Sequence, residues 1–254
     1  MSLPRLMVAP NGARRGKADH PALPVTIPEI VETARAAQAS GADGIHAHAR
    51  DADGRHSLDP VLCRELLAAL GEAVPGMHLQ LTSEAAGRYA PAEQIAAMQA
   101  IRPASLSVAL REVSPATPEG VDFYRWCAAE GLFVQHILYA PQELAALGEL
   151  LRLLPEPATP PAVIYVLGAY APARDGTPAE LGGFLKSAAL LPQKLDWMVC
   201  AFGRTERDCL AAALTQGGKV RVGFENNIHR PDGALAGSND EQVARIAGLM
   251  RQSA

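Results

Sequence analysis

The strongest constraint on the fold is a regular alternation, repeated eight times, of a short β-like run with a longer segment rich in alanine and leucine. The expected strands cover residues 5–10, 43–50, 77–83, 104–110, 132–140, 160–168, 195–203 and 219–225. The expected helices cover residues 27–41, 60–73, 91–101, 120–130, 143–154, 178–192, 207–217 and 238–252. Because helices of this length connect successive strands, the sheet is expected to be parallel.

Eight such units within 254 residues predict an α/β protein built as a (β/α)8 TIM barrel, with residues 1–254 forming a single domain. A doubly wound open sheet is the alternative. It is disfavoured because no GxGxxG motif follows the first strand. No linker rich in Pro, Gly or Ser is long enough to divide the chain, and PEPATPP (155–161) is expected to be a loop.

Composition excludes several classes of function. The net charge is −4 and there is no basic block, so a nucleic-acid partner is not expected. No run approaches the roughly 20 apolar residues of a membrane span, and the first ten residues do not resemble a signal peptide. We therefore expect a cytoplasmic protein. Its four cysteines lack CxxC spacing and are expected to be reduced, buried small hydrophobes: Cys63, Cys127, Cys200 and Cys209.

Function in a barrel of this kind resides at the C-terminal ends of the strands. Polar side chains follow several of the expected strands. They are Asn11, His46, His48, Arg50, Asp51, Gln80, Thr82, Ser83, Glu84, Ser107, Arg111, Glu112, His136, Tyr139, Arg221, Glu225, Asn226, Asn227 and His229. By contrast, His20, His56 and His78 are expected to face solvent.

The segment IHAHARD (45–51) places His46 and His48 two residues apart on one strand. Their side chains then share a face, with Cα atoms about 6–7 Å apart. Two histidines, a carboxylate and an open water position form a catalytic zinc arrangement, and Glu225, ending the eighth strand, can reach the same rim. The alternative is a pair of hydrogen-bonded core histidines. Both would then need polar partners in an apolar barrel, which favours the metal interpretation without excluding the other.

Two neighbouring segments each allow two interpretations. Arg50 begins a loop in which it can orient a histidine or bind an anion, and Asp53–Gly54 predicts a turn in the same loop. The segment LTSEAAG (81–87) offers hydroxyls at a strand end, either to bind substrate or to cap a helix.

Two stretches of the sequence resemble the β-keto acid cleavage enzymes. They are VAPNGARRGKADHPALPVTIPEIVETARAAQASGADGIHAHARDADGR and VRVGFENNIHRPDGALAGSNDEQV, which contain the paired signature HxHxRD and RVGxE. The resemblance is strongest over residues 8–60 and 197–243 and weak over 110–190. It implies a zinc-dependent (β/α)8 barrel that assembles as a homo-oligomer, a tetramer or a dimer. The implied reaction condenses a β-keto acid with acetyl-CoA to give acetoacetate and a new acyl-CoA.

The resemblance also implies roles for individual residues. His46, His48 and Glu225 match the positions that hold zinc, although such a set also suits other divalent metals. Arg221 matches the arginine that helps to activate the substrate. Thr82 and Ser107 fall near the hydroxyls that the family carries after its third and fourth strands.

One departure from the family pattern concerns the proton transfer. The family has an aspartate, paired with the arginine, where this chain has Asn226. Asn226 can orient Arg221 but cannot act as a base. Either Glu84 or a zinc-activated water then takes the proton, or the activity is changed or lost.

A second departure follows the first strand. The aminohexanoate-cleaving members have an acid there, whereas this chain has Arg14, Arg15 and Lys17. The basic segment predicts an anionic or neutral substrate, bound by Arg14, over an amino-bearing one. The alternatives are a solvated loop or contacts with CoA phosphates. Two other functions stay open, a zinc-dependent hydrolase or aldolase on the same barrel and a catalytically silent metal-binding relative.

Overall fold

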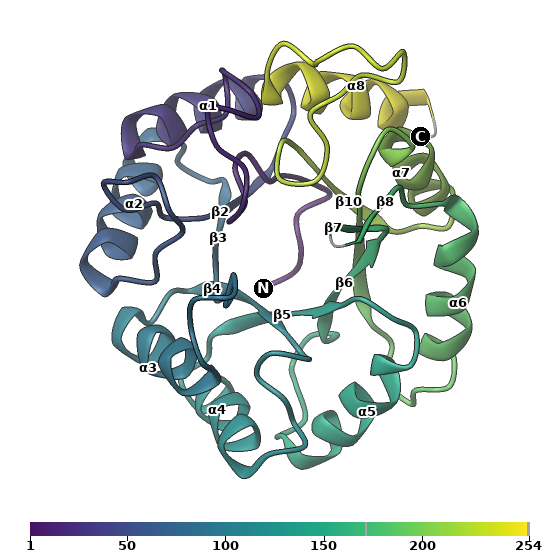
Figure 1. Cartoon of the computed structure of the whole chain (residues 1–254). Helices are drawn as coiled ribbons and strands as arrows, with labels where there is room; N and C mark the ends of the chain where they lie inside the picture. The colour runs from purple at the N-terminus through teal and green to yellow at the C-terminus, as the bar shows by residue number, and fades with distance from the viewer. Residues whose placement is uncertain (171, 253–254) are drawn as a thin grey trace.

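Eight parallel strands close into a barrel in the computed structural model, which describes residues 1–170 and 172–252 (Figure 1). Around the barrel the strands follow the order β1-β10-β9-β6-β5-β4-β3-β2, and β2 returns to β1. Their bounds are β1 Leu6–Val8, β2 Gly44–Ala47, β3 His78–Thr82, β4 Ser105–Ala109, β5 Phe133–Leu138, β6 Ala162–Leu167, β9 Asp196–Ala201 and β10 Lys219–Val222. The prediction of a (β/α)8 barrel is confirmed.

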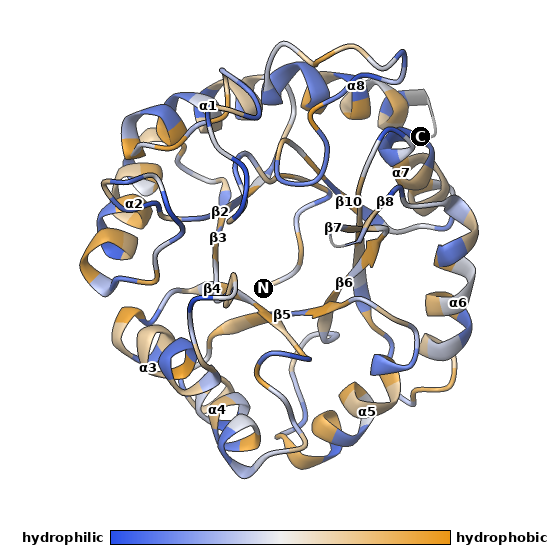
Figure 2. Ribbon diagram, in the orientation of Figure 1, coloured by the Kyte–Doolittle hydropathy of each residue, from blue (hydrophilic) through white to orange (hydrophobic). Residues whose placement is uncertain are grey.

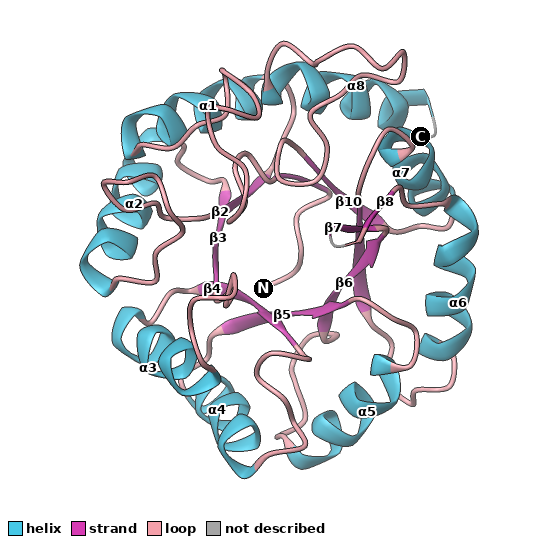
Figure 3. Cartoon of the chain, viewed as in Figure 1, coloured by secondary structure: helices cyan, strands magenta, loops and turns pink. Residues whose placement is uncertain are grey.

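Helices surround the barrel on its outer side and alternate with the strands (Figure 3). Their bounds are α1 Ile27–Ala39, α2 Pro60–Ala73, α3 Pro91–Ile101, α4 Pro118–Ala129, α5 Glu143–Leu153, α6 Pro178–Ala188, α7 Glu206–Thr215 and α8 Asn239–Gln252. Within the described residues, no helix combines the length and apolar character that crossing a bilayer requires.

Local sequence signals explain where α1 begins and ends. The hydroxyl of Thr26 accepts from the backbone N–H of Glu29, and the Glu29 carboxylate accepts from the N–H of Thr26, which completes a capping box. The helix ends at Ala39, two residues before the predicted Gly41. The Thr205 hydroxyl donates to the backbone carbonyl of Gly176, so it does not cap α7.

Two apolar layers hold the barrel together. The larger layer lies between the outer faces of the strands and the helices, and it includes Ile45, Leu66 and Val163. The smaller layer fills the barrel interior and includes Met7, Ile164 and other buried side chains. Hydrophobic residues dominate β5 and β6 in Figure 2. The four cysteines are free and buried, as the sequence analysis expected.

Two features of the mouth differ from the sequence prediction. Strand β10 ends at Val222, so Glu225 lies in the following loop and not on the strand. A short antiparallel hairpin, β7 (Ala169–Tyr170) and β8 (Ala173–Arg174), follows β6 and was not predicted. In Figure 1 the hairpin lies beside the ends of β6 and β10.

Candidate active site and metal centre

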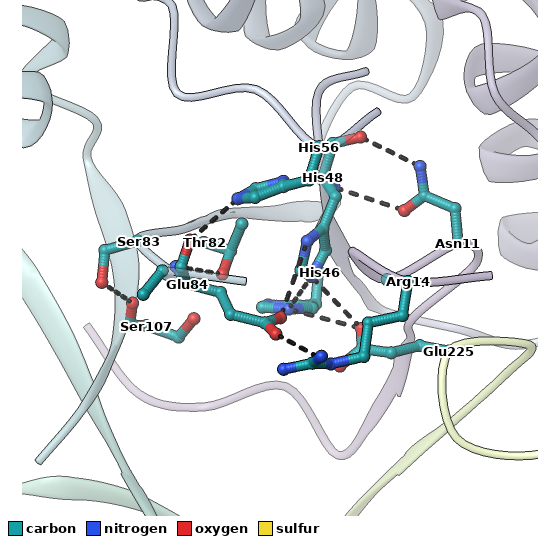
Figure 4. A network of polar contacts seen from close by, with 12 residues as sticks. Asn11, Arg14, His46, His48, His56, Thr82, Ser83, Glu84, Ser107 and Glu225 are labelled. Atoms are coloured by element: carbon teal, nitrogen blue, oxygen red, sulfur yellow. Dashed lines mark hydrogen bonds and ion pairs between the residues drawn. The ribbon is translucent and has the colours of Figure 1, made fainter. Parts of the chain in front are cut away.

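Three side chains from opposite ends of the chain converge at the barrel mouth. The Nε2 atoms of His46 and His48 lie 3.0 Å apart, and Glu225 Oε2 lies 3.5 Å from each of them. All three residues are buried, and their potential ligand atoms lie within 4.8 Å of one another. Figure 4 shows them pointing toward one another.

The backbone around Glu225 depends on two glycines with positive φ. Gly12 has a φ of 61°, and a Cβ there would lie 2.6 Å from Glu225 Cγ. Gly223 has a φ of 143°, and a Cβ there would lie 2.4 Å from the carbonyl oxygen of Ala9. Only glycine leaves this space at an accessible backbone conformation, so both positions let the loop bring Glu225 to the histidines.

A relay of two glutamines orients His46. Its Nδ1 atom lies 2.8 Å from Gln80 Oε1, and Gln80 Nε2 donates to Gln135 Oε1 at 3.0 Å. Gln135 Nε2 then donates to the carbonyl oxygen of Val163 at 3.5 Å. The relay crosses the barrel interior from β2 to β6, and the glutamine and histidine side chains in it are at most 1% exposed.

The relay fixes the tautomer of His46. The Val163 carbonyl can only accept, so the Gln135 amide must donate to it and present its oxygen to Gln80. Gln80 must therefore donate to Gln135 and present its own oxygen to His46. His46 carries its proton on Nδ1 as a result, and the Nε2 lone pair faces His48 and Glu225. A fixed tautomer of this kind is typical of a metal-ligating histidine.

Burial keeps both histidines neutral. It lowers the pKa of His46 to about 4 and places the pKa of His48 well below its usual range. Burial opposes the negative charge of Glu225, but the Arg221 guanidinium and the two histidines hold the pKa of that carboxyl well below its usual range. The site thus offers two neutral imidazoles and one carboxylate, the protonation states that bind a divalent cation.

The donor set fits such an ion. Among the described residues, Glu225 Oε2 is a buried atom without a hydrogen-bond partner. Glu225 Oε2 faces two Nε2 atoms at 3.5 Å, outside ordinary hydrogen-bond length. A cation bound to Glu225 Oε2 and to the two Nε2 atoms would satisfy this cluster. Two histidines with one carboxylate also leave one coordination position open.

Arg221 braces the other side of Glu225. Its Nη2 atom donates to Glu225 Oε1 at 2.8 Å and to Asn226 Oδ1 at 3.2 Å. The guanidinium is buried, and its Nε atom has no hydrogen-bond partner among the described residues. Asn226 therefore orients Arg221, the role that the sequence analysis assigned to it.

A cavity of about 270 Å³ opens beside the ligands. Its walls come from the loops after β1, β3, β4, β6 and β10, together with the ends of several strands. The cationic lining residues are Arg14, Arg111, Arg174 and Arg221, and the acidic ones are Glu84, Glu112 and Glu225. The cavity is therefore polar, strongly charged and open to a small anionic molecule.

Glu84 is the carboxylate of this cavity with the fewest partners. Its Oε1 lies 3.9 Å from Arg14 Nε and its Oε2 lies 4.0 Å from His48 Nδ1 (Figure 4). Burial, followed by the negative charges of Glu225 and Glu112, raises the pKa of Glu84 to about 7. A carboxyl with such a pKa can exchange a proton near neutral pH.

Comparison with known sequences decides the family. A family model described as beta-keto acid cleavage enzyme matches residues 5–254. The chain belongs to the beta-keto acid cleavage enzyme family. The resemblance seen in HxHxRD and RVGxE is thereby confirmed.

Curated members of the family match over most of their length. A 3-keto-5-aminohexanoate cleavage enzyme of Fusobacterium nucleatum is 28% identical over 95% of this chain and 89% of its own. A 3-oxoadipate:acetyl-CoA acetyltransferase of Cupriavidus necator is 26% identical over 97% of this chain and 88% of its own. The chain is thus similar to enzymes that act on different keto acids.

Solved structures with low identity share the fold. A binary complex of ObcA with oxaloacetate superposes with a TM-score of 0.71 at 16% identity, over 90% of this chain and 63% of the ObcA chain. A type I 3-dehydroquinate dehydratase of Clostridium difficile superposes with a TM-score of 0.63 at 10% identity, over 99% and 92%. At such low identity, both similarities support the barrel fold and no particular function.

The structure gathers most of the predicted site residues of this beta-keto acid cleavage enzyme. The cavity wall contains Arg14, His46, Thr82, Glu84, Arg221, Glu225 and Asn226, and His48 lies behind His46. Ser107 is buried on β4 beside Thr82 but does not line the cavity, and its backbone carbonyl accepts from Ser83.

Arg50 occupies a different environment from the one predicted. Its guanidinium donates to the backbone carbonyls of Asn11, Gly12, Arg15 and Gly54, and it is only 7% exposed. The residue therefore ties the loop after β1 to the loop after β2. Through that loop it supports Gly12, which packs against Glu225.

Sequence analysis assigned no role in the site to Gln80, Gln135, His56 or Tyr170. Gln80 and Gln135 form the relay, and their signal was a polar residue at an inward position of an otherwise apolar strand. His56 is 1% exposed, and its ring packs edge-on against His48, so the expectation that it faces solvent was wrong. His20 is also buried, at 3% exposed. Tyr170, from the hairpin, donates to the backbone carbonyl of Glu225.

Proposed function

We propose that this chain exchanges acyl groups between a β-keto acid and acetyl-CoA. The keto acid R–CO–CH2–COO⁻ and CH3–CO–SCoA give R–CO–SCoA and CH3–CO–CH2–COO⁻, so the products are a new acyl-CoA and acetoacetate. The observation that carries the proposal is the cluster of His46, His48 and Glu225 on a cavity shared with Arg221 and Glu84. The Cupriavidus necator relative, named as an acetyl-CoA acetyltransferase, supports the choice of co-substrate.

We propose Zn²⁺ as the ion held by His46, His48 and Glu225. Two imidazoles, one carboxylate and an open position suit zinc, and cobalt, manganese or iron could use the same donors. When bound, the ion supplies a Lewis acid for the keto oxygen of the substrate.

Glu84 is the base in this proposal. Of the three carboxylates that line the cavity, Glu225 belongs to the ligand set and braces Arg221. Glu112 accepts from the backbone N–H of Ala85 and the amide of Gln94. Glu84 lies 3.9 Å from Arg14 and 4.0 Å from the neutral His48, which leaves its oxygens available for the proton at C2 of the keto acid.

Arg221 and Thr82 stabilise negative charge on oxygen. The enolate formed at C2 attacks the acetyl carbonyl of acetyl-CoA, CoA leaves as the thiolate, and the thiolate then attacks the original keto carbonyl. The bond between that carbonyl and C2 breaks, which gives the new acyl-CoA and the enolate of acetoacetate, and the enolate takes the proton back from Glu84. The Nε–H of Arg221 is free among the described residues, and the Thr82 hydroxyl accepts from the N–H of Glu84, so its own O–H can donate. Fixed donors next to developing oxyanions are the most effective groups for this chemistry.

The lining favours an anionic keto acid. Arg14 and Arg111 are exposed side chains of the cavity wall, and Arg111 stacks on the Tyr139 ring at 3.4 Å, which leaves its N–H edges open. An Arg14→Glu variant should lower kcat/KM for a dicarboxylic β-keto acid relative to an amino-bearing one. An unchanged ranking of the two substrates would contradict this assignment.

The activity is tested by incubating the zinc-loaded protein with acetyl-CoA and a panel of β-keto acids. Acetoacetate and a new acyl-CoA should appear together, and neither should form without acetyl-CoA. Glu84→Gln should lower kcat by about 10²–10⁴ while zinc still binds. Cleavage of the keto acid without CoA would indicate a hydrolase or aldolase. Zinc binding with no turnover of any panel member would indicate a catalytically silent relative. This outcome is tested because Asn226 replaces the aspartate of the family.

A further inference from the structure

A second cavity of about 450 Å³ adjoins the catalytic one. The two share a wall, made of the hairpin residues Ala169, Tyr170 and Arg174 together with Phe202. The rest of the second cavity is lined by Ala173 and Asp175 and by residues of the loops after β1, β9 and β10. We name it the rim groove.

The rim groove carries an excess of positive charge. Its lining contains Arg15, Arg174 and Arg204, whereas Asp175 is its one acidic residue. Arg174 is paired with Glu180 outside the groove. Arg204 is exposed, and among the residues that the structure describes it has no hydrogen bond or ion pair. This local excess stands out in a chain whose net charge is −4.

The position of the groove on the barrel is informative. Strands β9 and β10 are the seventh and eighth strands of the barrel, and the loops after them supply Gly203, Arg204, His229 and Gly233. In (β/α)8 barrels this pair of loops frequently forms a phosphate-binding site. An unpaired arginine in that place therefore points to a phosphate ligand.

We propose that the rim groove binds the phosphates of the CoA nucleotide. This inference rests on the proposed function, because the thioester must reach the catalytic cavity past the shared wall of Tyr170 and Phe202. Arg204 contacts a phosphate directly, and His229 lies in the same lining. Arg15 contributes charge, although its guanidinium also donates to the backbone carbonyls of Phe224 and Glu225.

Removing the charge of Asp175 should change phosphate affinity in the opposite direction from removing the charge of Arg204. Its carboxylate packs against Gly203, where a Cβ would overlap with Asp175 Oδ1. It therefore lies beside Gly203, the residue before Arg204, and it lines the same groove, where a negative charge repels a phosphate. Removing that charge should strengthen binding, and removing the charge of Arg204 should weaken it.

The experiment measures binding of CoA to the zinc-loaded protein by isothermal titration calorimetry. Arg204→Gln should raise the Kd about tenfold, Arg204→Glu should raise it further, and Asp175→Asn should lower it. Arg125→Gln is the matched control, since Arg125 is an exposed arginine on α4, outside the groove lining, with an ion pair to Asp122. Wild-type affinities for Arg204→Gln and Arg204→Glu would overturn the proposal.

Two further comparisons identify which part of the ligand is bound. Adenosine 3′,5′-bisphosphate should compete with CoA, and Arg204→Gln should weaken that competition as well. The preference for acetyl-CoA over S-acetylpantetheine, as a ratio of KM values, should shrink about tenfold in Arg204→Gln. Competition by inorganic phosphate or ATP alone, with none by the bisphosphate, would overturn the assignment. If the protein binds CoA in this way but turns over no keto acid, the groove stands and the proposed function fails.

Discussion

Replacing Gln80 with leucine tests whether the glutamine relay controls the metal site. The substitution removes the acceptor of the His46 Nδ1–H, 2.8 Å away, without touching any of the three ligands. His46 can then carry its proton on Nε2, the atom that faces the ion. Loss of such a partner typically weakens metal binding 10- to 100-fold, about 1.4–2.7 kcal/mol.

The relay also predicts a cost to folding. Leucine at position 80 leaves Gln135 Oε1 buried without a donor, and an unsatisfied buried group costs about 1–3 kcal/mol. The assay is competition for Zn²⁺ against a chromophoric chelator at neutral pH, combined with thermal unfolding of the metal-free protein. Nitrogen-15 spectra of the imidazoles should show His46 as the Nδ1–H tautomer in the wild-type protein only.

A control separates the tautomer effect from a general loss of packing. Gln94 is also buried, and its amide donates to the Ser83 carbonyl and to Glu112, away from the ligands. Gln94→Leu should destabilise the protein but leave zinc affinity within about twofold. Equal losses of affinity in Gln80→Leu and Gln94→Leu, or no loss in Gln80→Leu, would refute the reasoning.

Three other predictions follow from the charges near the site. Arg221→Met leaves the Glu225 carboxylate buried without its partner, so metal-free stability should fall by about 3–5 kcal/mol and recover partly when zinc binds. Burial raises the pKa of Glu206 to about 8 in the folded protein. Between pH 4.5 and 8 the unfolded chain therefore holds fewer protons than the folded protein, so the free energy of unfolding falls as pH rises, by on the order of 4 kcal/mol. Glu206→Gln should remove most of that dependence. Chelation should lower Tm, because an ion at 100 times its Kd adds about 2.7 kcal/mol.

Each of these predictions has a contradicting result. Equal denaturant midpoints for Arg221→Met and the wild type would show that the pair contributes nothing. Parallel stability–pH curves for Glu206→Gln and the wild type would show that Glu206 titrates normally. A Tm that does not respond to chelator, for protein with measured zinc content, would place the ion outside the folded site.

The barrel and the ligands could be predicted because both have short-range signatures. Alternating strand-like and helical segments determine the eight units, and His46 and His48 at a spacing of two must share a strand face. Glu225 was found through its motif, although its place on a loop depends on the turn at Gly223, which the motif alone does not reveal.

Other parts of the site depend on contacts between distant segments. The pairing of Gln80 with Gln135 spans 55 residues, and no local pattern indicates it. The burial of His56 depends on how its loop folds against Glu84 and His48. Two-residue strands such as β7 and β8 are too short to show any periodicity. Arg50 was placed near the site correctly, but the four carbonyls that it binds come from three separate stretches.

The hairpin of β7 and β8 has a consequence for how this enzyme can diversify. It forms part of the wall of both cavities, and Tyr170 fastens it to the backbone of Glu225. His46, by contrast, is held from inside the barrel by Gln80 and Gln135. A hairpin exchanged for that of another member should therefore change the lining of both cavities, and it keeps Glu225 in place only where a side chain still makes the contact of Tyr170. The hairpin is therefore the part of the site most open to variation, whereas the glutamines inside the barrel hold His46 in place.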